Sequence, residues 1–117
     1  MNIPDLANGL RRELKRRKYF VRMEILEQTK SLIKARLYIS SDLFVQAYRN
    51  DGFQTTNLVL IHNGIRLFAR GEVDGHWHRH LHTEPEEHDF SAEGQRAIEL
   101  QEFLDEVEKI LAGLNLP

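Results

Sequence analysis

The dipeptide Asn63-Gly64 lies between two segments that are typical of β-strands, 54–62 and 65–73. A type I′ turn needs a positive φ at both central residues, which asparagine and glycine adopt readily. The sequence therefore predicts an antiparallel hairpin with a two-residue loop, and such a loop sets the register. On the buried face we expect the pairs His62–Ile65, Leu60–Leu67 and Leu58–Ala69. On the other face we expect Ile61–Arg66, Val59–Phe68 and Asn57–Arg70.

Three segments before this hairpin also have strand character. Apolar and polar residues alternate over 20–25 and 32–39, as they do in strands with one buried face, and 43–49 ends at the turn-forming run Asn50-Asp51-Gly52. After the hairpin, Asp74-Gly75 turns the chain into a sixth candidate strand that contains four histidines.

Amphipathic helices are predicted at both ends of the chain. Pro4 suits a first helical turn, and the leucine stripe after it indicates a basic helix over 4–18. Ser91 is a plausible cap for a final helix that Gly113 would end. We therefore expect residues 1–117 to form a single α+β domain. Its antiparallel meander sheet of about six strands would lie between an N-terminal basic helix and a C-terminal amphipathic helix.

Composition restricts the compartment and the chemistry. The chain has no cysteine, which excludes disulfides and thiolate metal sites and favours a reducing cytosol. No apolar run approaches the roughly 18 residues of a membrane span, and the first residues lack the layout of a signal peptide. A cytoplasmic protein without membrane contact is expected.

Charge is distributed unevenly along the chain. Residues 1–70 contain 13 Lys and Arg against 6 Asp and Glu, whereas residues 71–117 contain 3 against 12. The basic excess is densest over 11–18, and a run of this kind can bind phosphates. Its candidate nucleic-acid-binding residues are Arg11, Arg12, Lys15 and Arg16. The alternative is a solvated helix face that pairs with the acidic C-terminal helix.

The sixth candidate strand places histidine at every second position, His76, His78, His80 and His82. Alternate residues of a strand share a face, so these imidazoles would lie together, opposite Trp77 and Arg79. Two histidines spaced H-x-H can bind one metal ion. With His88 or His62 as a third ligand, His78 and His80 would form a three-histidine site for a divalent transition metal such as zinc, with one position open.

The same histidines also suit acid–base chemistry without a cofactor. Cleavage of RNA needs a base, an acid and a cation for the developing charge. We expect His78 and His80 to supply base and acid, with His88 orienting or participating. The cation would come from Arg70, Arg66 or Arg79, and the last two are also candidates for binding RNA.

Two non-catalytic interpretations remain open. The histidines can belong to an exposed edge strand that is kept soluble by polar residues. The chain can equally be an interaction module, in which the basic helix docks on an acidic partner or two copies form a homodimer through sheet edges or helices.

Several stretches together resemble the TumE-like family. They are residues 23–27, 32–39, 43–50 and 75–80, followed by 85–88, and the most specific element is Trp77-His78-x-His80 before an acidic, proline-containing segment that ends at His88. The resemblance implies a cytoplasmic toxin of a prokaryotic type II toxin–antitoxin pair. Its partner would be a DNA-binding antitoxin and its target RNA or translation. The possible ribonuclease activity is an extrapolation from the histidines, not from the family.

Overall fold

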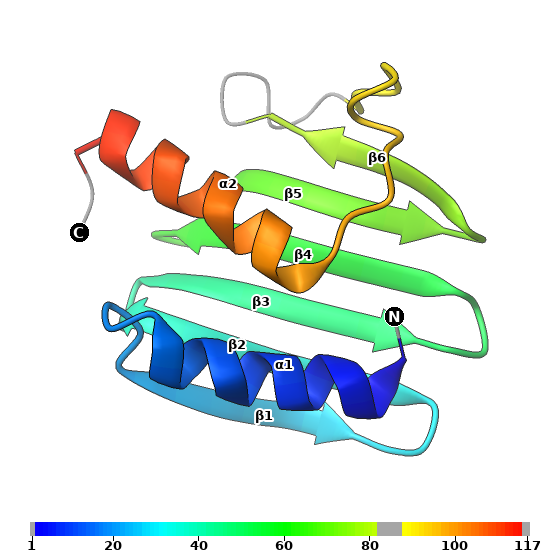
Figure 1. Cartoon of the computed structure of the whole chain (residues 1–117), viewed down its shortest axis with the longest axis horizontal. Coiled ribbons are helices and arrows are strands. Elements are labelled where there is room, and N and C mark those ends of the chain that lie inside the picture. Colours follow the sequence, from blue (N-terminus) through cyan, green and yellow to red (C-terminus); the bar gives the residue numbers. More distant parts are fainter. Residues whose placement is uncertain (1, 82–87, 116–117) are drawn as a thin grey trace.

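A computed structural model describes residues 2–81 and 88–115 of the chain. It confirms the predicted α+β fold, a six-stranded antiparallel meander with one helix before it and one after it (Figure 1). The elements are α1 (Ile3–Arg16), β1 (Arg22–Gln28), β2 (Leu32–Ser40), β3 (Leu43–Asn50), β4 (Thr55–His62), β5 (Ile65–Val73), β6 (His76–His80) and α2 (Leu100–Gly113).

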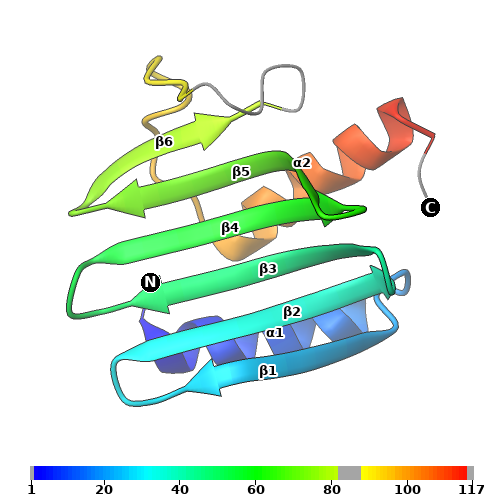
Figure 2. The ribbon, with the colours of Figure 1, turned by 180° about the vertical axis from the view of Figure 1, so that it is seen from behind.

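Both helices cover the same face of the sheet. The strands follow one another in chain order from β1 to β6, and each pair is antiparallel. From behind, the opposite face is free of helices (Figure 2). We call the two sides the helix-covered face and the open face.

The hydrophobic core lies between the helices and the helix-covered face. Alternate strand residues such as Leu37, Val45 and Leu58 are fully buried there. Phe103 of α2 stacks on Phe68 of β5, with ring centroids 5.5 Å apart and planes inclined by 12°. Trp77 packs at the border of this core, as its position in the strand pattern predicts.

Arg17 joins the two helices. This buried guanidinium donates to Glu13 of α1 and to Asp105 and Glu108 of α2, each at 2.9 Å. The basic run and the acidic C-terminal helix are therefore paired at this one position, and the other basic residues of α1 stay exposed.

The β4–β5 hairpin closes as the sequence predicts. Asn63 and Gly64 have positive φ values of 52° and 76°. The two pairs beside the turn are the predicted ones, His62–Ile65 and Ile61–Arg66.

Farther from the turn, the predicted register is wrong. It shifts by one residue between Leu60 and Ile61, because β5 contains Leu67 as an extra residue there. The shift turns Phe68 toward the core, where it stacks on Phe103. It also moves Arg70 to the helix-covered face. The observed pairs are Leu60–Phe68, Val59–Ala69, Leu58–Arg70 and Asn57–Gly71.

The final helix begins later than predicted. Ser91 closes a short turn, in which the Gln95 N–H donates to its carbonyl, and no helix follows directly. Instead α2 starts at Leu100, where Glu99 and Glu102 form a capping box. The residues between Ser91 and Leu100 run across the sheet toward the start of α2 (Figure 1).

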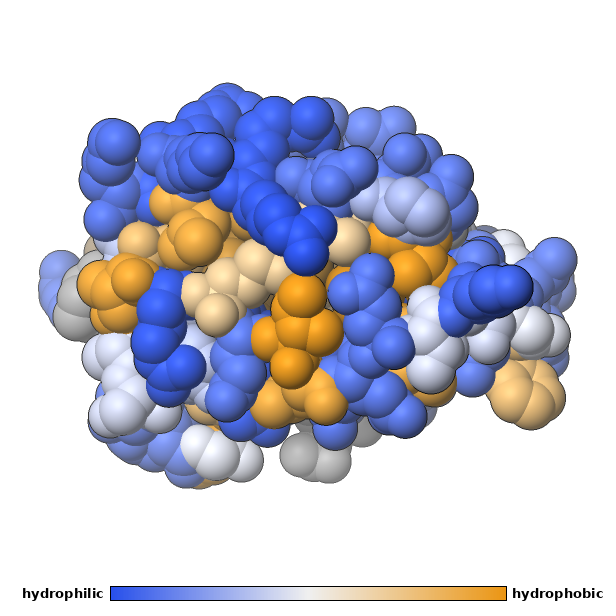
Figure 3. All heavy atoms as spheres, turned by 90° about the horizontal axis from the view of Figure 1, so that it is seen from below, coloured by the Kyte–Doolittle hydropathy of each residue, from blue (hydrophilic) through white to orange (hydrophobic). Residues whose placement is uncertain are grey.

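The β1 edge of the sheet has no neighbouring strand among the described residues. Apolar side chains reach the surface there in a band between hydrophilic areas (Figure 3). Val21 is 68% exposed, and Ile25 and Leu26 are each 40% exposed. In the part of the chain that the structure describes, neither helix has the length and apolar character needed to cross a membrane.

Candidate metal centre

The histidines of β6 lie on the open face of the sheet. His78 pairs with Gly71 of β5, and His80 pairs with Ala69. Trp77 and Arg79, which alternate with them, point to the helix-covered face. The extended conformation that the alternation predicts is therefore present over His76–His80; His82 lies outside the described residues.

His88 reaches the same place from a separate segment. Asp89 forms an antiparallel bridge with Arg79, through backbone hydrogen bonds of 2.8 and 3.3 Å in the two directions. The carboxylate of Asp89 also accepts from the Arg79 guanidinium. Because side chains alternate, His88 and Phe90 then lie on the other side, with the β6 histidines.

Three imidazoles form a compact cluster. The ring centroid of His80 lies 4.3 Å from that of His88 and 5.2 Å from that of His78, and the His78–His88 distance is 4.9 Å. One nitrogen from each ring can be chosen so that all three lie within 4.8 Å of one another. Buried His80 is innermost, His78 is half-buried and His88 is exposed.

Phe90 borders the cluster on its outer side. Its ring is stacked on His88, with centroids 5.8 Å apart and planes inclined by 12°, and lies 5.9 Å from His78. This apolar neighbour reduces the contact of the imidazoles with water.

Gly71 makes room for the cluster. A Cβ atom at this position would lie 3.1 Å from Cε1 of His78 and 2.6 Å from Oδ1 of Asn57. The imidazole and the amide therefore approach the backbone of β5 from its two neighbouring strands. Sequence reasoning missed both Gly71 and Asn57, and only the corrected register places them in a row with His78.

The surroundings keep His78 neutral. Burial lowers the pKa of His78 from its usual value of 6.5, and the nearby charges of His80, His88 and Arg66 lower it further. A neutral imidazole is the form that binds a metal ion or accepts a proton.

The spacing suits a transition metal. Two imidazole nitrogens on one tetrahedral zinc ion lie about 3.3 Å apart, because each Zn–N bond is about 2.0 Å long. Ligand nitrogens within 4.8 Å of one another therefore need only small side-chain rotations to bind one ion. Three histidines would leave one coordination position open.

The arginines predicted for the site are separated by the sheet. Arg70 is fully buried on the helix-covered face, where it donates to Glu93 at 2.9 Å and to Glu106 at 2.8 Å, so the prediction that it contacts a substrate at the histidines is wrong. Arg79 points to the same face and pairs with Asp89. Of the three, Arg66 lies on the open face, where its charge acts on His78.

The basic residues of α1 are also remote from the histidines. The exposed cluster lies on the helix-covered side of the molecule, and the histidines lie on the open face. One nucleic-acid strand would have to pass around the edge of the sheet to contact both the basic cluster and the histidines. The cluster consists of Arg11, Arg12, Lys15 and Arg16.

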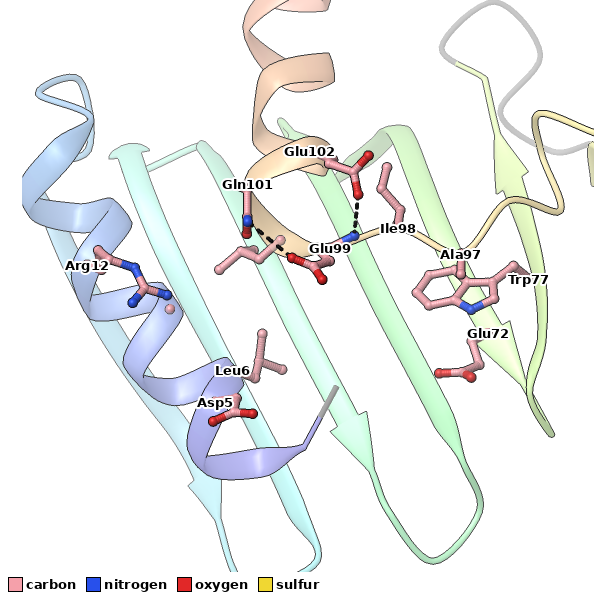
Figure 4. A pocket seen from close by; sticks show the side chains of 12 residues that line it. Asp5, Leu6, Arg12, Glu72, Trp77, Ala97, Ile98, Glu99, Gln101 and Glu102 are labelled. Carbon is pink, nitrogen blue, oxygen red and sulfur yellow. Dashed lines mark hydrogen bonds between the residues drawn. The ribbon is translucent and has the colours of Figure 1, made fainter.

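A cavity of about 780 Å³ opens on the helix-covered face, between α1 and the start of α2 (Figure 4). Trp77 and Glu72 of the sheet line it together with Arg12 and Glu102 of the helices. None of the clustered histidines belongs to its lining.

Comparison of the chain with protein-family models, with curated proteins and with solved structures found no match.

Proposed function

We propose that this protein binds one divalent transition-metal ion through His78, His80 and His88, and that it acts through the coordination position left open. The observation that carries the proposal is the convergence of three imidazoles from two segments on one small volume. Zinc is the ion whose preferred ligands and tetrahedral geometry fit this set best.

The electrostatics of the cluster support metal binding. Metal ions bind neutral imidazole, so a lowered pKa of His78 reduces the competition from protons at neutral pH. The buried position of His80 limits the contact of water with the inner side of the site. A bound ion of this type would supply an activated water for hydrolysis.

Arg66 gives the site its expected preference for anions. It lies on the open face, close enough for its charge to act on His78. An anionic group that approaches the open position would meet this guanidinium, and a phosphodiester has the matching charge.

Metal titration of untagged protein tests the proposal. We expect one zinc ion per chain by isothermal titration calorimetry, and loss of this binding in the variants His78→Ala, His80→Ala and His88→Ala. His76→Ala and His62→Ala are matched controls, since neither residue belongs to the cluster. Equal binding by all five variants would refute the site.

A second candidate function is a metal-independent ribonuclease of the toxin type. The specific observation in its favour is a neutral histidine, His78, beside the cation of Arg66. In this hypothesis the protein acts on RNA in the cytoplasm and has an antitoxin partner, as the resemblance to the TumE-like family implies.

Incubation with total RNA in the presence of a chelator separates the two candidates. Degradation that His80→Ala abolishes would support the ribonuclease. Intact RNA at high protein concentration would remove it and leave the metal centre.

A further inference from the structure

We propose that the open face of the sheet binds a single-stranded polynucleotide and leads it to the histidine cluster. The inference deepens the proposed function and rests on it for the chemistry, because it names the substrate class of the same centre. Binding along the sheet stands on separate observations and is tested separately.

Two cross-strand rows on the open face connect the histidines of β6 with β2. Residues that face one another in the register share a face, so each row is a continuous line of side chains. The first row contains Lys34, Tyr48, Asn57, Gly71 and His78. The second row contains Arg36, Gln46, Val59, Ala69 and His80. From β2 to β6 each row spans four strand spacings, about 19 Å.

The charge of this face suits a polyanion. Among the described strand residues of β2 to β6 that point to the open face, Lys34, Arg36 and Arg66 are basic and none is acidic. The acidic residues of this face are on the edge strand β1, where Glu24 pairs with Arg36 and Glu27 pairs with Lys34. The carboxylates of Glu72 and Glu106 lie behind the sheet, in ion pairs on the helix-covered face. Between β2 and β6, phosphates would therefore meet these cations, and the carboxylates of β1 mark the outer end of both rows.

The rows also offer groups that bind unpaired bases. Tyr48 is half-buried in the middle of the first row, and Phe90 is 58% exposed beside His88. Aromatic rings stack on unpaired bases whatever their identity. Asn57 lies between Tyr48 and Gly71 in the first row, and Gln46 lies next to Arg36 in the second, where its Oε1 accepts from Arg36 at 3.0 Å. The amide N–H groups of both side chains can donate to base edges.

This mode of binding favours a single strand over a duplex. Stacking on a protein ring needs bases that are not already stacked on both sides within a helix.

Fluorescence anisotropy with labelled 12-nucleotide probes tests the proposal. The probes are 2′-O-methyl RNA, which resists cleavage through the 2′-hydroxyl, DNA of the same sequence, and the RNA duplex. All titrations contain a chelator, so that binding does not depend on a metal. We expect one or both single strands to bind at least tenfold more tightly than the duplex.

Charge reversal at two matched positions locates the binding surface. Lys34→Glu should weaken single-strand binding about tenfold, and Lys34→Gln should reduce the salt dependence by about one phosphate contact, a slope change of roughly 0.7. Tyr48→Ala should weaken binding several-fold, with folding checked by circular dichroism. Arg12→Glu on α1 changes the charge equally and should leave the affinity within twofold.

The opposite pattern would overturn the inference. Loss of binding in Arg12→Glu with full binding in Lys34→Glu would place the nucleic acid on α1. Equal binding of the duplex, or the absence of any binding, would reject single-strand binding along the open face. Zinc titration of Lys34→Glu keeps the two proposals apart. This variant should bind zinc normally, so the absence of polynucleotide binding on the open face would not contradict the proposed metal site.

Discussion

The imidazole of His78 lies over Gly71, the one position in β5 where it meets no side chain from the residue beneath it. A Cβ atom there would come within 3.1 Å of Cε1 and 3.3 Å of Nε2 of the ring. On the other side, Oδ1 of Asn57 would be only 2.6 Å away, which is closer than real Cβ atoms allow. The glycine therefore sets how closely the His78 ring approaches the backbone of β5.

Gly71→Ala should weaken zinc binding by about tenfold without unfolding the protein. The added methyl group would push away either the amide of Asn57 or the ring of His78. Both are the ends of side chains that can rotate, so the fold should survive the change. Isothermal titration calorimetry measures the affinity, and the histidine ring signals in an NMR spectrum report the displacement.

Gly113→Ala is the matched control, because nothing lies within 4 Å of the position that its Cβ would occupy. It should bind zinc as the unsubstituted chain does. Unchanged affinity and unchanged His78 signals in Gly71→Ala would show that the ring does not depend on the gap.

Zinc affinity should fall steeply as the pH drops from 7 to 5. The pKa of His78 is lowered from 6.5, so this ring is neutral at pH 7 and becomes protonated only in more acidic solution. In that acidic range, protons compete with the ion for the nitrogen of His78. Titrations across this range should show proton release that increases toward low pH, and affinity independent of pH would contradict histidine ligation.

The same lowered pKa predicts the sign of the stability change in metal-free protein. The folded state binds the proton on His78 less readily than the unfolded chain does. The stabilising contribution is therefore complete above pH 6.5 and is lost as the pH falls through the lowered folded-state value. Urea denaturation at pH 7.5 and at pH 5.5 should differ less in His78→Ala than in the unsubstituted chain.

Arg70→Ala should destabilise the fold rather than act on the chemistry alone. The guanidinium is fully buried and donates to Glu93 and Glu106, both partly exposed. Loss of one member of a buried ion pair costs about 3 kcal/mol, and the cavity adds to it. Urea denaturation measures the change in the free energy of unfolding.

Arg96→Ala tests the same carboxylate from its exposed side. Arg96 also pairs with Glu93, but its side chain is 41% exposed, so its loss should cost no more than about 1 kcal/mol. If Arg70→Ala lowered the free energy of unfolding no more than Arg96→Ala does, the buried ion pair would not hold the segment around Glu93 against the sheet.

Much of the fold is readable from the sequence because a strand has a period of two. Alternation alone predicts that His78 and His80 share a face, and Asn63-Gly64 predicts the turn and the pairs beside it. The extra residue Leu67 is not predictable in this way. Its place in β5 depends on Phe68 reaching Phe103 of a helix more than thirty residues later in the chain.

The site was partly predictable for the same reason. The sequence predicts His88 or His62 as a third ligand, and the approach of His88 to His80 depends on the Arg79–Asp89 bridge. The sequence predicts Arg70 for the site because its strand is expected to lie beside the histidine strand, and the uncorrected register places it on the face opposite the core. One residue of shift reverses the face of every side chain beyond it, so the role of Arg70 could not be settled without the register.

Acid should loosen the segment that carries His88 before the sheet unfolds. Hydrogen bonds from the Ser91 backbone and from Arg79 lower the pKa of Asp89 to about 2, and hydrogen bonds from Arg96 and Arg70 lower that of Glu93 to about 2. Both folded-state values lie below those of the free acids, 3.8 and 4.5. The stabilisation is therefore present above about pH 4.5 and is lost as the pH falls toward 2.

Hydrogen exchange of backbone amides measures this loosening. The Asp89 amide, which donates to the Arg79 carbonyl at 2.8 Å, should lose protection between pH 4.5 and 2. The amides of β3, in the middle of the sheet, should remain protected over the same range. Asp89→Asn removes one of the two titrating groups and keeps an acceptor for the Ser91 amide, so protection at position 89 should depend less on pH, and the remaining dependence should come from Glu93. Simultaneous loss at Asp89 and in β3 would instead mean that acid unfolds the whole domain in one step, and that the carboxylates do not hold this segment as a separate unit.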